Sequence, residues 1–157
     1  MTNTDVCKIL EEIGALLELT GENPFKSRAY FHAVGIIQAL DVPLQKLVEQ
    51  GKLSSIKGIG KALTKKITEL VETGKLEYYK KLKESVSPGL FEIVSLPGLD
   101  RRKTGLIYLK LGVSTLAELE QACLEDRIST LRGFNEEKQQ KLLEEIADYK
   151  NTRATCH

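Results

Sequence analysis

Five lysines stand between residues 52 and 67, and no acidic residue interrupts them. This segment contains Gly58 and Gly60, and glycine permits positive φ angles and close approach of another chain. Because helical spacing resumes at Lys61, the free N–H groups of a helix N-terminus are expected to point outward there, at the positive end of the helix dipole. The nearest ammonium groups are those of Lys57, Lys61 and Lys65. Together these groups predict an anion site that a nucleic-acid phosphate fits.

Lys66 differs from the other lysines of this segment. At about 100° per residue it falls within an apolar stripe with Ile67 and Leu70, whereas Lys65 falls outside it. Partial burial among apolar and ammonium groups disfavours the charged form of a lysine, and a neutral amine can attack an aldehyde carbon. The alternative is a lysine whose stem covers apolar surface while its head reaches water.

The charge is distributed unevenly. The formal net charge is +1, but residues 51–90 hold nine lysines and four glutamates. A nearly neutral protein with one positive block has a face for an anion rather than a basic coat. Because the groups around Gly58 and Gly60 cannot read base edges, any binding of nucleic acid is expected to be independent of sequence and sensitive to salt.

Other functional classes find little support. The three cysteines are Cys7, Cys123 and Cys156, and with two histidines and no CxxC they indicate neither a disulfide framework nor a zinc site. We expect them to be small buried hydrophobes or idle thiols. No apolar run approaches the ~18 residues of a membrane span, and no signal peptide is apparent at the start. The default expectation is a cytoplasmic protein without a membrane partner.

Helical spacing of apolar residues recurs along the whole chain, and no strand-type alternation is sustained. We predict an all-α protein with two small helical subdomains, separated by the segment 85–89. Helices are expected near 5–19, from Asn23–Pro24, from 43 to Gly51, over 60–73 before Gly74, and near 76–84, 90–95, 101–111, 115–123 and 136–149. The tail, 151–157, lacks periodicity and is expected to be frayed.

Three segments align without gaps: 56–67, 96–107 and 131–142. They share an apolar residue, any residue, a glycine, another apolar residue, a turn residue and then a helix, as in a helix-hairpin-helix motif. Asp100 and Asn135 stand where the first copy has Gly60, and both residue types tolerate left-handed backbone. Asp100 would oppose a phosphate, although Arg101 and Arg102 follow it. We therefore predict a phosphate site in the first copy, a weak or lost one in the second, and a scaffold in the third.

Four blocks of this sequence resemble the amino-terminal region of family X DNA polymerases, especially the bacterial members. They are the segments 23–30 (NPFKSRAY), 56–61 (IKGIGK), 72–76 (ETGKL) and 95–99 (SLPGL), and the resemblance covers about residues 5–150. It implies a lyase-type domain over 1–84, with its hairpin at 56–67, and a second helical domain over 90–150, with degenerate hairpins at 96–107 and 131–142. The polymerase palm and the phosphoesterase domain have no counterpart in this sequence, so polymerase activity is not expected.

The resemblance also implies roles for single residues. Lys26 and Tyr30 match the family's 5′-phosphate pocket, and Lys66 matches its Schiff-base lysine. Ala62 stands where vertebrate members carry a basic residue, and Lys61 is adjacent. In the family, hairpin carbonyls bind a monovalent cation. For this chain we expect no required cofactor and a possible Na⁺ or K⁺ at the hairpin. The matching carbonyls are those of Ile56 and Ile59 in the first copy, and of Leu96 and Leu99 in the second.

Three functions follow from these observations as expectations. The first is sequence-independent binding of gapped, nicked or 5′-phosphorylated DNA, or of a junction between single strand and duplex, in DNA repair. The phosphate-binding groups would then be those of Lys26, Tyr30, Lys57, Gly58, Gly60, Lys61, Lys65, Arg101 and Arg102. The second is a 5′-deoxyribose-phosphate or AP lyase that uses Lys66. The third is a scaffold that binds repair proteins.

Overall fold

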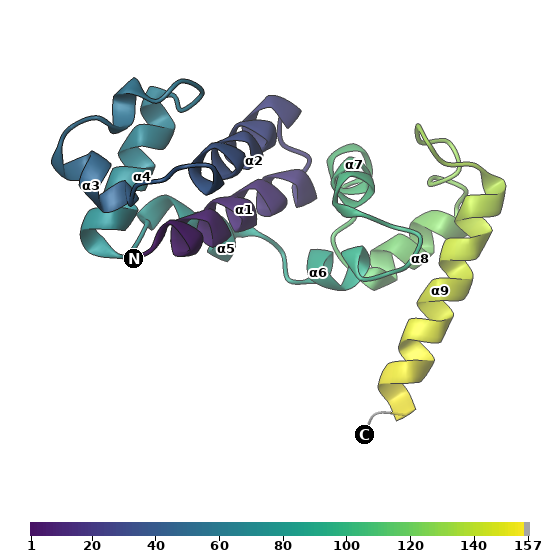
Figure 1. The fold of residues 1–157 in the computed structure, drawn as a ribbon. Coiled ribbons are helices and arrows are strands. Elements are labelled where there is room, and N and C mark those ends of the chain that lie inside the picture. The colour runs from purple at the N-terminus through teal and green to yellow at the C-terminus, as the bar shows by residue number, and fades with distance from the viewer. Residues whose placement is uncertain (156–157) are drawn as a thin grey trace. The chain divides into compact units, whose positions relative to one another are not determined.

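The computed structural model describes residues 1–155, and all regular structure within them is helical, which confirms the predicted all-α class (Figure 1). The chain divides into two compact units. Unit 1 comprises Met1–Glu18 and Glu22–Ser85, and unit 2 comprises Leu19–Gly21 and the chain from Val86 onward. The division at 85–86 falls at the start of the linker expected from the sequence, and each unit has its own core.

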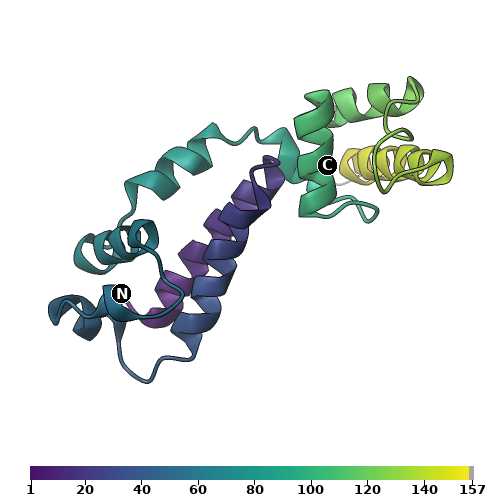
Figure 2. The ribbon, with the colours of Figure 1, turned by 90° about the horizontal axis from the view of Figure 1, so that it is seen from above.

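Unit 1 is built on a helical hairpin with shorter helices beside it. Figures 1 and 2 show α1 and α2 running side by side in opposite directions. The elements are α1 (Asn3–Leu19), α2 (Pro24–Gln38), α3 (Leu44–Glu49), the 3₁₀ helix η1 (Leu53–Ser55), α4 (Lys61–Thr73) and α5 (Glu77–Ser85). The predicted helices of this half are confirmed to within two residues, and η1 was not expected.

Local chemistry explains where these helices begin and end. Asn23 caps α2 with its side-chain oxygen, which accepts the Phe25 N–H at 2.9 Å, and Pro24 follows at the first helical position. Gly74 ends α4 in the left-handed conformation, at φ +76°, and donates its N–H to the Leu70 carbonyl. Gly51 has φ +65° after α3, as expected.

The core of unit 1 is formed by the apolar stripes of α1, α2 and α4, to which α3 adds Leu44. Burial of this apolar area is the main force that holds the short helices together. The core residues with the least exposure are Val6, Leu10, Ile13, Ala33, Ile37, Leu44, Ile67 and Leu70.

Unit 2 contains α6 (Gly89–Val94), α7 (Arg101–Leu111), α8 (Leu116–Leu124) and α9 (Glu136–Thr155). Thr115 caps α8 by accepting the Glu118 N–H, while the Glu118 carboxylate accepts the Ser114 N–H. The N–H and hydroxyl of Ser114 both donate to this carboxylate, and these bonds lower the pKa of Glu118 because they favour its charged form. In this unit α7 and α8 begin with side-chain caps, whereas α6 begins at Pro88 without one.

The carboxy-terminal helix is longer than expected. We predicted a helix over 136–149 and a frayed tail over 151–157, but α9 continues through Thr155. No glycine or proline interrupts the chain after Glu136, so nothing ends the helix where its apolar periodicity fades. Residues 156–157, with Cys156, lie outside the described residues.

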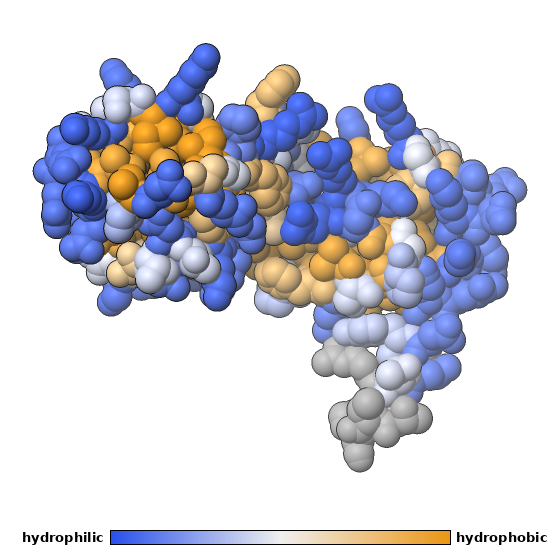
Figure 3. All heavy atoms as spheres, in the orientation of Figure 1, coloured by the Kyte–Doolittle hydropathy of each residue, from blue (hydrophilic) through white to orange (hydrophobic). Residues whose placement is uncertain are grey.

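No helix among residues 1–155 combines the length and the apolar character that crossing a membrane requires. Figure 3 shows mainly hydrophilic side chains over unit 1 in this view, around one apolar area.

Candidate nucleic-acid interface

The three aligned segments share one hydrogen-bonded turn, although Gly58 and Gly133 have positive φ angles and Gly98 does not. In each, the N–H of the apolar residue after the glycine donates to the carbonyl of the apolar residue three positions earlier. The pairs are Ile59 to Ile56 at 3.3 Å, Leu99 to Leu96 at 3.0 Å and Phe134 to Leu131 at 3.0 Å. The helix that follows also begins at the same position, through bonds from Thr64 to Gly60, Thr104 to Asp100 and Gln139 to Asn135. We call these turns the first, second and third hairpins.

The elements before the turns differ. The first hairpin follows the 3₁₀ helix η1, and the second follows α6. The third follows only a hydrogen-bonded turn at 128–131. The common feature is therefore the turn and its second helix, and these are the parts that would hold a phosphate.

The two glycines of the first hairpin act differently, and one expectation about them was wrong. Gly58 does adopt a positive φ, of +96°, but Gly60 has φ −78° and ψ 175°, an extended backbone open to any residue. A Cβ atom at Gly60 would meet nothing within 4 Å. Gly60 is thus the N-cap of α4. Because it has no side chain, it leaves the first N–H groups of the helix without a side-chain acceptor.

Asp100 and Asn135 show what a side chain does at this position. Neither adopts the left-handed backbone that we expected; Asp100 has φ −125° and ψ −177°, and Asn135 has no positive φ. Instead, both are N-caps. Asp100 Oδ1 accepts the Lys103 N–H at 2.8 Å, and Asn135 Oδ1 accepts the Lys138 N–H at 2.8 Å. The second and third hairpins fill with their own oxygens the place that the first leaves to an external anion.

Exposed lysines surround this uncapped helix start. Lys57 lies in the turn, and Lys61 and Lys65 lie on the first turns of α4; all three are exposed. No acidic residue lies in the first turn of α4. The site therefore combines unopposed backbone donors with mobile positive charge, as phosphate binding requires.

One face of α2 extends this surface with residues that sequence analysis did not single out. The missing Cβ of Gly58 would lie 2.5 Å from Ile36 Cδ1 and 3.3 Å from His32 Nε2, so the hairpin rests directly on α2. Gly58 lines a shallow depression with Arg28, Ala29, Phe31 and His32. The four-residue spacing of Arg28 and His32 was a signal that could have indicated a shared helix face.

An exposed aromatic ring stands at the start of the same helix. The side chain of Phe25 is 74% exposed, and the Arg28 guanidinium carbon lies 5.6 Å from its ring centre. A ring in this position offers a face to a nucleic-acid base.

The residues that resemble the family's 5′-phosphate pocket differ in exposure. Lys26 is exposed, and its Nζ lies 3.8 Å from Glu22 Oε2. Tyr30 is only 7% exposed and belongs to the core of unit 1. Burial raises the pKa of Tyr30 well above its usual value, and a hydrogen bond with Tyr78 adds to this. Its hydroxyl is therefore neutral at physiological pH and faces another tyrosine.

Tyr78 also joins Lys66 to this group. Lys66 is half-buried on α4, and its Nζ lies 4.6 Å from the centre of the Tyr78 ring. The ring face attracts the ammonium form. The structure thus brings Lys66 and Tyr30 together through Tyr78, an arrangement that the sequence did not reveal.

The remaining predicted residues lie elsewhere. Arg101 and Arg102 are exposed in the first turn of α7, in unit 2. Among the described residues, no cluster of His, Cys, Asp and Glu could hold a metal. The Ile56 carbonyl accepts one long hydrogen bond and keeps a second lone pair, so the expected Na⁺ or K⁺ contact to Ile56 and Ile59 fits the turn and stays a prediction.

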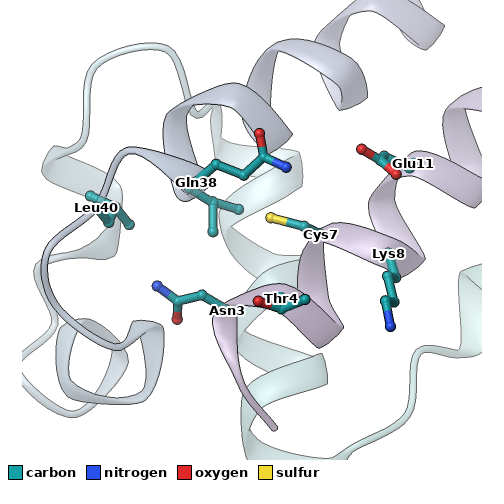
Figure 4. Close-up of a pocket in the computed structure, with 8 residues that line it drawn as sticks. Asn3, Thr4, Cys7, Lys8, Glu11, Gln38 and Leu40 are labelled. Carbon is teal, nitrogen blue, oxygen red and sulfur yellow. The ribbon is translucent and has the colours of Figure 1, made fainter.

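A second depression of unit 1 lies around Cys7, and Figure 4 shows Cys7 pointing from α1 toward the segment with Gln38 and Leu40. The Cys7 thiol contacts the Val34 carbonyl at 3.8 Å, and burial raises its pKa. Burial likewise raises the pKa of Cys123, to about 11. Both cysteines are buried, which confirms the expectation of small buried hydrophobes for these two.

Comparisons with known proteins agree with this division of the chain. Residues 1–76 match the model of a helix-hairpin-helix domain, and residues 91–148 match that of a SAM-like helix-hairpin-helix tandem. The DNA polymerase/3′-5′ exonuclease PolX of Bacillus subtilis (strain 168) is 32% identical over 148 residues, which are 94% of this chain and 25% of that protein. The chain spans about a quarter of the length of this relative.

Proposed function

We propose that this chain binds the phosphate backbone of DNA through its first hairpin. Two helix-hairpin-helix models match the chain, and its sequence is related to the amino-terminal region of family X DNA polymerases. The domain matches and the polymerase relative both support DNA binding. The observation that carries the choice of hairpin is the uncapped start of α4 at Gly60, beside Lys57 and Lys61.

The proposed complex has the following chemistry. A phosphodiester oxygen accepts N–H groups at the start of α4, and the three lysines neutralise nearby phosphates. Arg28 and His32 extend the contact along α2, and the ring of Phe25 stacks on a base that is not paired. These groups distinguish backbone shape rather than sequence, and the Phe25 ring favours gaps, nicks and strand ends over intact duplex. A role in DNA repair, beside other repair proteins, would use this preference.

Replacing Lys61 by glutamate should weaken this binding at least tenfold at about 0.1 M salt, since it removes one phosphate contact and adds a repulsive charge. Fluorescence anisotropy with a gapped and an intact duplex, across a salt series, measures this effect. The plot of log K against log salt should become shallower by about one.

Lys8→Glu is the matched control, because Lys8 is an exposed lysine that lines the separate depression around Cys7. It should retain most of the affinity and the salt slope. Equal binding by wild type and Lys61→Glu would overturn the proposal and would favour the scaffold function, for which the self-capped second and third hairpins are the supporting observation.

We propose lyase activity through Lys66 as a second candidate function, supported by the contact of Lys66 with Tyr78 beside Tyr30. In its neutral form, the Lys66 amine attacks the aldehyde carbon C1′ of an abasic deoxyribose, and water leaves to form an imine. Removal of a proton from C2′ then expels the 3′-phosphate by β-elimination.

Borohydride reduces such an imine to a stable amine, so a covalent complex between wild type and an incised abasic duplex is the expected result. Lys66→Arg keeps the charge and the contact with Tyr78 but has no amine of this kind, and it should lose at least nine-tenths of the complex. Lys65→Ala, at the exposed neighbouring position, should retain it. An undiminished complex in Lys66→Arg, or none in wild type, would contradict the lyase assignment.

A further inference from the structure

The second hairpin differs from the first by more than its cap. The N–H of Gly98 donates to Glu145 Oε2 at 2.9 Å, across 47 residues of sequence, and Glu145 lies on α9. Gly98 is the counterpart of Gly58 in the aligned turns. Among the described residues, no acceptor binds the Gly58 N–H. A carboxylate therefore binds the glycine N–H of the second hairpin, whereas the glycine N–H of the first hairpin stays open. The two backbones also differ here, because Gly58 has φ +96° and Gly98 has no positive φ.

The Glu145 carboxylate lies in a pocket that could also hold an external anion. Glu145 lines a pocket with Lys103, Lys138 and Lys141, whose apolar wall includes Phe134. No ion pair within 4 Å joins Glu145 to any lysine of the described chain, and its Oε1 is buried without a hydrogen-bond partner. Three lysines thus line a pocket that holds one carboxylate, and one of them, Lys138, donates its ammonium to the Gly133 carbonyl at 2.9 Å.

The missing side chain of Gly98 is what lets the Glu145 carboxylate approach the backbone. A Cβ atom there would lie 2.6 and 2.8 Å from the two carboxylate oxygens of Glu145. Only glycine lets the carboxylate reach the backbone so closely. A phosphodiester group also carries one negative charge and presents two oxygens, so it could make the same contact with the Gly98 N–H.

We propose that Glu145 is an internal substitute for a DNA phosphate and that it closes the second hairpin to DNA. This inference rests on the proposed function, because it assumes that a helix-hairpin-helix turn of this chain can bind a phosphate through its backbone donors. It explains why a pocket with three lysines lies beside a hairpin whose backbone donors are already occupied, by Glu145 at Gly98 and by Asp100 at Lys103. Removal of the carboxylate should open a second phosphate site.

Glu145→Ala tests this, with Glu144→Ala as the matched control. Glu144 is the exposed neighbour on α9, so both variants remove one negative charge. In anisotropy titrations with a 5′-phosphorylated gapped duplex, Glu145→Ala should bind about three- to tenfold more tightly than Glu144→Ala. Its salt slope should be steeper by about 0.9, the value for one additional phosphate.

A nuclear magnetic resonance titration locates the change. The Gly98 amide resonance should shift on addition of DNA in Glu145→Ala and stay in place in wild type. If circular dichroism shows that Glu145→Ala does not fold, the same comparison is made between Glu145→Gln and Glu144→Gln, since glutamine keeps the shape and loses the charge.

Equal affinity and slope for the Glu145 and Glu144 variants, or a shift of the Gly98 amide in wild type, would overturn the inference. Both alanine variants are also tested with Lys61→Glu present. If Lys61→Glu alone leaves wild-type binding unchanged, the proposed function of the first hairpin fails, whereas the difference between the Glu145 and Glu144 variants still decides whether the second hairpin was closed.

Discussion

Replacing Gly60 by aspartate is expected to reduce DNA affinity by about ten- to a hundredfold while the protein stays folded. The backbone at Gly60 is extended, and a Cβ there meets nothing within 4 Å, so the substitution fits without strain. Asp100 shows the consequence in the second hairpin, where the side chain accepts an N–H of the helix that follows. In the first hairpin the new carboxylate would occupy the place of the phosphate and repel it, at a loss of about 1.5–3 kcal/mol for a charge-assisted bond.

The free energy of unfolding of Gly60→Asp should rise slightly or stay unchanged, although the DNA affinity falls. A change between glycine and aspartate at an N-cap alters the free energy of unfolding by only a few tenths of a kcal/mol, in favour of the side chain. Denaturant unfolding measures this, and anisotropy with a gapped duplex measures the affinity. Loss of binding without loss of stability cannot be attributed to unfolding.

Gly60→Asn separates the two causes of the expected loss. Asparagine caps the helix as Asn135 does in the third hairpin, but it has no charge. We expect Gly60→Asn to weaken DNA binding by about tenfold, the lower end of the range expected for Gly60→Asp. If Gly60→Asp binds DNA as wild type does, the start of α4 is not the phosphate site.

The same comparison shows which parts of the structure the sequence could predict. The ends of α3 and α4 were predictable, because Gly51 and Gly74 follow apolar helical spacing at the position where left-handed backbone ends a helix. The start of α2 was predictable from Asn23 and Pro24. In each case the deciding groups are neighbours in sequence.

The role of the residue at the Gly60 position was misjudged for a physical reason. Gly, Asp and Asn all tolerate left-handed backbone, and this shared property suggested a positive φ in all three hairpins. The three residue types are also common N-caps, and the structure shows that this second property applies. Sequence alone did not separate the two properties, since each is compatible with the same three residues.

Long-range contacts account for what could not be predicted at all. No spacing rule relates Glu145 to Gly98, or Tyr78 to Lys66 and Tyr30, because these pairs meet only when helices from distant segments pack together. The position of Arg28 and His32 beside Gly58 has the same origin. The anion-binding groups of the first hairpin could therefore be predicted from the local sequence, whereas the residues of α2 that pack beside it could not.

Gly58→Ala is expected to destabilise unit 1 by about 2–4 kcal/mol and to abolish most of the DNA binding. A residue with a Cβ pays about 1–2 kcal/mol for left-handed backbone, and φ at Gly58 is +96°. The new Cβ would also lie 2.5 Å from Ile36 Cδ1, so the hairpin or the Ile36 side chain has to move at a further cost. Displacement of the turn would carry Lys57 and the start of α4 away from the surface that α2 completes.

Gly133→Ala is a matched control from the third hairpin. Gly133 has φ +87°, but a Cβ there meets nothing within 4 Å, so alanine adds backbone strain without a clash. Hydrogen exchange of core amides, read separately in each unit, should show a loss of about 1–2 kcal/mol in unit 2 for Gly133→Ala and a larger loss in unit 1 for Gly58→Ala. Gly133→Ala should keep its DNA affinity. Equal losses of stability in the two variants would mean that the hairpin does not rest on Ile36. Retained DNA binding in a destabilised Gly58→Ala would mean that phosphate contact does not need the turn held against α2.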